Sequence, residues 1–173
     1  MACTCTIGTI EQFCGGVNAP GLDRMLSWTC EDELLAIPAA TADTHNVATD
    51  ITYRAAATGP PAVTAGKFRK FYIAKEDMSY SSERDENGMH KTEVKMFVPK
   101  LEAEKSYILN GATGDNQVWI VPDKNGKKRI VGAIGNGASL KYKAQTNPKN
   151  GYEVTVMWES AHEPYFYAGA ITY

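Results

Sequence analysis

The chain has 173 residues and a formal net charge of −2, so it is long enough for one domain with a sizeable core. Its charge gives no overall attraction to nucleic acid or to an anionic membrane. Hydrophobic residues make up 43% and charged residues 22%, and no apolar run approaches the roughly 20 residues of a membrane span. The first residues lack the features of a secretory signal, so we expect an intracellular product.

The N-terminal residues 1–20 are rich in Cys, Thr and Gly and have no helical period, which predicts an extended arm. Residues 21–38 have an apolar spacing that fits either a strand or a short helix. Residues 39–66 are an Ala- and Thr-rich stretch in which only Ile51 and Tyr53 alternate with polar neighbours. We predict a long loop or extension there.

The four cysteines all lie in the first thirty residues, at Cys3, Cys5, Cys14 and Cys30. Structural zinc sites favour two close pairs of cysteines, and here only one pair is close. In a reducing cytoplasm thiols stay unpaired. Unpaired thiols are therefore the main expectation, with a zinc knuckle or redox chemistry as alternatives.

Strand signals become regular after residue 66. One strand is expected within residues 67–75, and residues 77–98 read as strand, polar turn and strand, which predicts a protruding hairpin. In its second arm, Val94, Met96 and Val98 face one way.

Residues 101–111 are the one good helix candidate. Leu101, Lys105 and Ile108 fall on neighbouring turns, and Gly111 supplies a C-terminal stop. More strands are expected at residues 117–121, 128–134, 138–146, 152–158 and 163–173.

In the strand at residues 152–158, one face consists of Tyr152, Val154, Val156 and Trp158. Helices between successive strands, which a parallel sheet needs, are missing from this pattern. The sequence therefore predicts one mainly β domain over residues 1–173, an antiparallel β-sandwich or barrel with one packed α-helix.

Asn-Gly dipeptides between apolar runs predict two-residue type I′ turns. They occur at Asn87-Gly88, Asn110-Gly111, Asn125-Gly126, Asn136-Gly137 and Asn150-Gly151. Asp123 also resembles the start of a calcium loop, but the sixth and twelfth positions are then Lys128 and Ile134. Because a calcium loop needs Gly and Glu there, we interpret this stretch as a hairpin turn.

A search for catalytic or metal-binding motifs gives no match. His45, His90 and His162 are scattered, and no second His follows His162 at the spacing of a zinc protease. The Gly-Lys at residues 66–67 is followed by Phe68, where a phosphate loop has Ser or Thr. We therefore expect no enzymatic activity, no cofactor and no metal.

Basic residues form three small clusters, which could bind phosphate groups. These are Lys67, Arg69 and Lys70; Lys127, Lys128 and Arg129; and Lys141 with Lys143. Acidic residues are interspersed with them along the chain. A mixed solvated surface, or complementary patches on a self-associating subunit, fits this pattern better than sequence-specific nucleic-acid recognition.

Three features favour assembly: the weakly patterned segments 1–20 and 39–66, the charged hairpin, and the edges of an open sheet, which neighbouring subunits can cover. The order of strands, helix and turns through residues 14–26, 67–108, 118–146 and 150–160 resembles structural proteins from phage tail-gene clusters. It is most similar to the siphovirus-type tail tube proteins.

This resemblance implies subunits that form hexameric rings, which stack into a hollow tube through which the genome leaves the capsid. Sheets of adjacent subunits would join around the lumen, and DNA would pass without sequence-specific binding. The inter-ring loop would be Glu83, Arg84, Asp85, Glu86, Asn87 and Gly88. The arm, with Cys14, Gly15 and Gly16, would also contact the next ring. Other tail proteins would be partners, and the virion tail the location, after synthesis in the host cytoplasm.

Two other classes remain open. The chain could be another tail component, such as a terminator, a head–tail connector or a baseplate subunit. It could instead be a monomeric carbohydrate-binding sandwich with an aromatic platform. The candidate platform residues are Trp119, Trp158, Tyr165 and Tyr167, although their place in apolar strands favours core packing.

Overall fold

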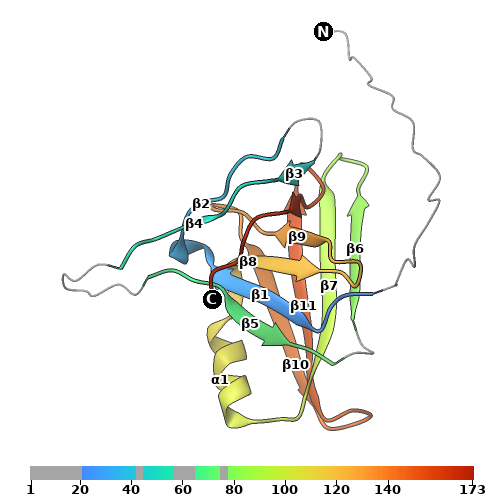
Figure 1. Cartoon of the computed structure of the whole chain (residues 1–173). Coiled ribbons are helices and arrows are strands. Elements are labelled where there is room, and N and C mark those ends of the chain that lie inside the picture. The colour runs from blue at the N-terminus through green and yellow to red at the C-terminus, as the bar shows by residue number, and fades with distance from the viewer. Residues whose placement is uncertain (1–20, 42–44, 57–64, 75–77) are drawn as a thin grey trace.

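The computed structural model of the chain is mainly β, with one short α-helix among the residues that it describes (Figure 1). The described residues are 21–41, 45–56, 65–74 and 78–173. The arm predicted at residues 1–20, with Cys14, Gly15 and Gly16, lies outside these ranges. The mainly β class and the packed helix are confirmed.

Most of the predicted strands are present with small shifts of their ends. The elements are β1 Met25–Cys30, a 3₁₀ turn Glu31–Glu33, β2 Leu34–Ala36, β3 Asn46–Val47, β4 Thr52–Tyr53, β5 Arg69–Tyr72, β6 Ser79–Arg84, β7 His90–Pro99, α1 Ala103–Gly111, β8 Gly114–Pro122, β9 Lys128–Val131, β10 Ala138–Gln145, β11 Gly151–Ser160 and β12 Phe166–Tyr167. Residues 21–38, which fitted a strand or a helix, form strands around the short 3₁₀ turn.

The main sheet has the strand order β3-β12-β9-β8-β10-β11-β7-β6, and β1 pairs with both β8 and β5. All pairs are antiparallel except β12 with β3, so the prediction of a purely antiparallel sheet is wrong at this edge. The sheet curls on itself. Just beyond β5, the N–H of Ala74 donates to the carbonyl of Phe97 in β7 at 2.8 Å. The β5 end of the sheet thereby meets β7.

The inner core fills the inside of this curl. The predicted faces are confirmed: Val94, Met96 and Val98 of β7 are buried there, as are the predicted apolar residues of β11. Their register across β7 and β11 is continuous over ten residue pairs from Gly151↔Pro99 to Ser160↔His90. Strict alternation along both strands therefore places one side chain in two against the core.

The outer core lies on the other face of β8 and β9. In β8, Trp119 and Val121 point to the inner core while Val118 and Ile120 point to the outer core, which explains its continuous apolar run. The described part of the predicted 39–66 extension covers this outer face. There, Val47 is fully buried against the chain's own sheet. The described residues of this segment therefore pack on the chain's own sheet.

Gly132 permits the passage from β9 to β10. Its φ is +102°, and a Cβ atom would lie 2.3 Å from the carbonyl oxygen of Gln117. Only glycine combines this left-handed backbone with so close an approach. β9 and β10 can therefore share the same edge of β8, each pairing with one half of that strand.

The helix α1 packs mainly through a residue that its predicted pattern did not include. Leu109 is buried in the inner core, Leu101 just before the helix packs on the same core, and Ile108 is 42% exposed. Gly111 is the last helical residue and does not have positive φ. The helix therefore ends where the sequence predicted, but without a left-handed glycine cap. Ala112 follows it, and the N–H of Ala112 donates to the carbonyl of Ile108 at 2.9 Å.

The Asn-Gly dipeptides do not all form turns. Asn110-Gly111 lies in α1, and Gly151 begins β11. The turn predicted at Asn136-Gly137 is centred on Ile134 and Gly135, where Gly135 has a φ of +79°. Asn-Gly therefore marks the ends of elements well in this chain, but it does not identify the turn type.

Candidate assembly surfaces

The outer edge of the sheet at β6 is the first candidate surface. None of its six residues is buried, although β7 beside it contributes several residues to the inner core. Among the described residues, β7 is the only strand that pairs with β6. An edge strand of this kind carries unpaired backbone groups that can accept a strand from another chain.

The alternation of hydrogen-bonded and non-hydrogen-bonded pairs between β6 and β7 shows which backbone groups of β6 can bind another strand. The N–H of Asp85 donates to the carbonyl of Met89 at 2.8 Å, and β6 and β7 keep this register throughout. In an antiparallel ladder, hydrogen-bonded and non-hydrogen-bonded pairs alternate. The backbone groups of Tyr80, Ser82 and Arg84 therefore point away from β7, toward the open edge.

Asp85 organises the tip of the hairpin. Its carboxylate accepts the N–H groups of Asn87 and Met89, each at 2.9 Å, and its carbonyl accepts the N–H of Gly88 at 3.0 Å. Gly88 has a φ of +83°, but Asn87 does not have positive φ. The tip is thus a three-residue loop with a glycine bulge, and the predicted two-residue type I′ turn is wrong.

Acidic side chains dominate the cleft between the hairpin and β11. Its charged lining consists of Glu83, Arg84, Asp85, Lys91, Glu93 and Glu159. The Nζ atom of Lys91 is 3.5 Å from Asp85 and 3.9 Å from Glu159, so one cation serves two carboxylates. The N–H of Met89 above all, and then Lys91, hold the pKa of Asp85 below its ordinary value. Exposed pairs of this kind add little stability.

Tyr80 ties β6 to the opposite end of the sheet. The guanidinium of Arg129 in β9 lies 4.8 Å from the ring of Tyr80 and 4.6 Å from the ring of Phe166. Burial raises the pKa of the Tyr80 phenol. This aromatic–cation stack holds the root of the hairpin against the sheet.

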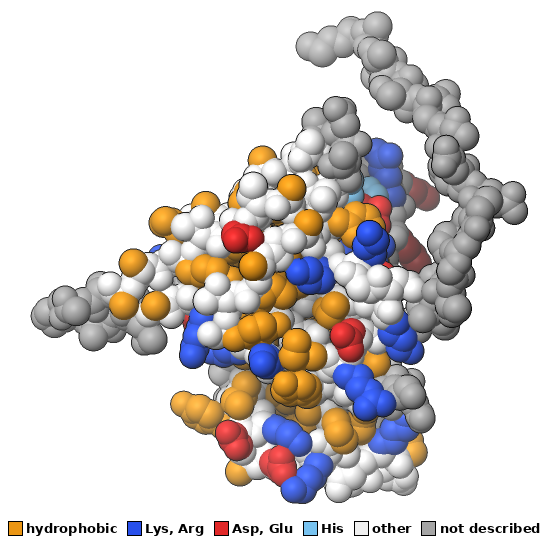
Figure 2. Space-filling model, viewed as in Figure 1, with side chains coloured by type: hydrophobic (Ala, Val, Ile, Leu, Met, Phe, Trp, Pro, Cys, Tyr) orange, Lys and Arg blue, Asp and Glu red, His pale blue; other side chains and the backbone are white. Residues whose placement is uncertain are grey.

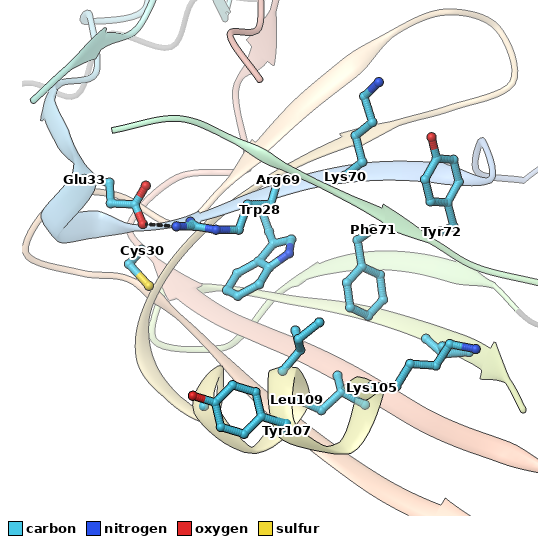
Figure 3. Close-up of a pocket in the computed structure, with 13 residues that line it drawn as sticks. Trp28, Cys30, Glu33, Arg69, Lys70, Phe71, Tyr72, Lys105, Tyr107 and Leu109 are labelled. Carbon is cyan, nitrogen blue, oxygen red and sulfur yellow. Dashed lines mark ion pairs between the residues drawn. The ribbon is translucent and has the colours of Figure 1, made fainter. Parts of the chain in front are cut away.

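A groove between α1 and the β1–β5 pair is the second candidate surface, with a volume of about 610 Å³. Figure 3 shows Trp28 and Phe71 projecting from the strands toward the helix, which presents Leu109 and Tyr107. Figure 2 shows hydrophobic side chains spread over this side of the molecule, with Lys and Arg among them. The floor is therefore apolar.

The mouth of the groove combines exposed aromatic rings with cations. Tyr107 is 82% exposed and Tyr72 is 63% exposed. Arg69 forms an ion pair with Glu33 at 2.7 Å, while Lys70 and Tyr72 project from the other face of β5, at the rim of the groove (Figure 3). Large exposed rings beside an apolar floor are typical of an interaction surface.

Cys30 lies at one end of the groove and is partly buried, which raises the pKa of its thiol and disfavours the thiolate that metal binding needs. The other three cysteines, Cys3, Cys5 and Cys14, lie outside the described residues. Within the described ranges, no group of three or more His, Cys, Asp or Glu side chains could hold a metal ion.

The aromatic platform of the carbohydrate-binding alternative does not exist on these residues. Trp119, Trp158 and Tyr167 are buried in the two cores. Tyr165 is half-buried and stacks on His162, with ring centroids 4.1 Å apart. The expectation of core packing is thereby confirmed for the three buried residues.

The basic clusters are separated in the structure. Arg69 and Lys70 lie on β5, Arg129 lies between two aromatic rings, and Lys141 and Lys143 lie exposed on β10. The structure brings the six hairpin residues together, but sequence reasoning missed the groove. The sequence signal for the groove was the run Tyr107, Ile108 and Leu109 in the helix, in which two large side chains are exposed beside a buried one.

Comparison of the chain with protein-family models, with curated proteins and with solved structures found no match. No helix in the described part of the chain has the length and apolar character needed to cross a membrane.

Proposed function

We propose that this chain is a non-enzymatic structural subunit that self-assembles through its open sheet edges. The observation that carries the proposal is β6: a six-residue strand without one buried residue, held on a sheet whose other strands are well packed. Within the chain, β6 packs against the inner core through Tyr80, and its remaining residues form an exposed edge of the kind that natural proteins protect against unwanted pairing. A partner strand would satisfy the outward backbone groups of Tyr80, Ser82 and Arg84.

In its more specific form, the proposal is that the subunit is a siphovirus-type tail tube protein. Copies would form hexameric rings through edge pairing, and the rings would stack into the tube through which DNA leaves the virion. The helix α1 and the charged hairpin support this form because both belong to the pattern that carries the resemblance. DNA would pass without sequence-specific binding, and other tail proteins would bind the tube ends.

The substitution Ser82→Pro tests edge pairing directly. Proline removes an N–H that points away from β7, so the hairpin ladder should survive while a partner strand loses a hydrogen bond and meets the proline ring. We expect electron micrographs of the purified variant to lose the assemblies that wild-type protein forms, with an unchanged circular dichroism spectrum.

The matched control is Ser81→Ala, an exposed change on the same strand that leaves every backbone group in place. Wild-type-like tubes from Ser82→Pro would refute pairing at this edge. Discrete single rings from the wild-type protein would favour a terminator or connector over a tube subunit.

A further inference from the structure

The hairpin tip, residues 85–89, and the α1 groove lie at opposite ends of the molecule. β7 begins directly after the tip and runs for ten residues, and α1 follows its other end. At about 3.3 Å per residue, this strand separates the two features by roughly 33 Å. Figure 1 shows the β6–β7 turn and α1 at opposite ends. A contact from the tip of one copy to the groove of another would therefore join copies along one axis.

The apolar parts of the two surfaces are complementary. The groove has a floor that includes Trp28, Phe71 and Leu109, and its volume exceeds that of any one side chain. At the tip, Met89 is 36% exposed, and a flexible thioether fits irregular apolar gaps well. A small-molecule site would need polar groups converging on the floor, but the charged groups here lie at the mouth.

The charges of the two surfaces are also complementary. At the groove end, Lys100 and Lys105 share the single carboxylate of Glu102, and Lys70 lies 4.7 Å from the ring of Tyr173. With Glu104 of α1 and the Arg69–Glu33 pair included, the four cations around α1 and β5 outnumber the three carboxylates. At the hairpin tip the carboxylates outnumber the cations, because Lys91 alone lies near both Asp85 and Glu159.

Glu86 at the tip and Glu83 in the adjoining strand β6 are exposed, and neither forms an ion pair with another described residue. Carboxylates are thus in excess there. Opposite excess charge on two surfaces steers their encounter and fixes its orientation.

We propose that the hairpin tip of one copy docks into the α1 groove of the next copy, with Met89 entering the apolar floor and Glu86 facing the lysines. This inference rests on the proposed function, and it names the acceptor surface for stacking. Because the two surfaces differ, the contact is head-to-tail and leaves a tip and a groove unused at the ends of every stack. Such a contact extends without limit, as a tube requires.

Two variants with one defective surface each test this contact. The tip variant carries Glu86→Ser and Met89→Ser, and the groove variant carries Tyr107→Ser and Ile108→Ser. All four side chains are exposed and none belongs to either core, so both variants should fold, which their circular dichroism spectra check. The matched control carries Leu35→Ser and Ile134→Ser, which removes exposed apolar side chains outside both surfaces.

Light scattering gives the mass of each protein alone and of an equimolar mixture. We expect each variant alone to stop at its unstacked species, either a single subunit or a single ring. The mixture should double that mass, because the intact tip of one variant meets the intact groove of the other. The control variant should assemble like the wild-type protein.

Three results would overturn the inference. Wild-type assembly by either variant would exclude its surface from stacking while leaving self-assembly intact. A mixture that keeps the mass of its components would exclude the groove as the acceptor of the tip. A wild-type protein that stays monomeric at every concentration would overturn the proposed function itself, and the inference with it.

Discussion

Two hairpins in this molecule have the same turn and different roles. In the β8–β9 hairpin, Asp123 accepts the N–H groups of Asn125 and Lys127 at 2.9 and 2.8 Å, and Gly126 has a φ of +78°. The β6–β7 tip repeats these bonds from Asp85, with its glycine at +83°. An aspartate at the first position and a glycine at the fourth therefore specify the same three-residue loop twice.

The strands that these turns connect differ in burial. β8 contributes Trp119 and Ile120 to the two cores, and β9 adds Ile130 and Val131, whereas β6 contributes no buried residue. Their turns also differ in charge, with lysines on one and carboxylates on the other. Turn chemistry therefore fixes the local geometry of both hairpins, while burial decides whether a hairpin belongs to the core or is available for contact.

The largest expected difference between the hairpins is in core stability. Trp119→Ala should lower the free energy of unfolding by about 3–5 kcal/mol, because it empties a fully buried site beside Trp28 and Phe71. On β6, Ser81→Ala should change it by less than about 0.5 kcal/mol. Urea unfolding followed by circular dichroism measures both, and equal losses would contradict the assignment of β6 as a surface strand.

A smaller loss of stability, of the same size in the two hairpins, is expected when either turn glycine is replaced. Gly88→Ala and Gly126→Ala should each cost about 1–2 kcal/mol, because both positions have left-handed backbone. Neither is sterically blocked: an added Cβ at Gly126 meets nothing within 4 Å, and one at Gly88 meets Arg84 at an ordinary 3.5 Å. Thermal unfolding of the two variants compares them. A large difference would mean that the turns are not equivalent.

The smallest effect concerns pH at the hairpin tip. The pKa of Asp85 is lowered in the folded chain, so its stabilising contribution is complete above the ordinary value of 3.8 and is lost as the pH falls through the lowered value. The protection of the Asn87 and Met89 amides, measured as exchange relative to an unstructured peptide at the same pH, should therefore fall below about pH 3.8. In Asp85→Asn this fall should vanish, and its persistence would assign the effect to another group.

The sequence predicts correctly those strands in which the alternation of apolar and polar residues matches the alternation of buried and exposed side chains. Strands β7 and β11 were predicted with their buried faces, since each alternates between apolar and polar residues along its packed part. Sequence reasoning failed where contacts distant in the sequence decide the structure. The short strand β3 exists only because Val47 covers the outer core, and no local pattern marks it. β12 lies inside the strand predicted at residues 163–173, but it is only two residues long.

The candidate surfaces were recovered to different degrees. The hairpin was predicted from its charged turn between two strand patterns, but the turn type was not, because the Asn-Gly signal does not contain the contribution of Asp85. The groove could not be predicted, because it depends on the angle at which α1 meets β1 and β5. Only the fold brings Leu109 and Phe71 to the same place.

The mass of the wild-type protein by light scattering, across a concentration series, tests the central claim most directly. Self-assembly through edge and groove predicts a mass that rises with concentration to that of rings and then of stacks. A mass that stays at that of one subunit, up to the highest concentration at which the protein remains in solution, would contradict the account.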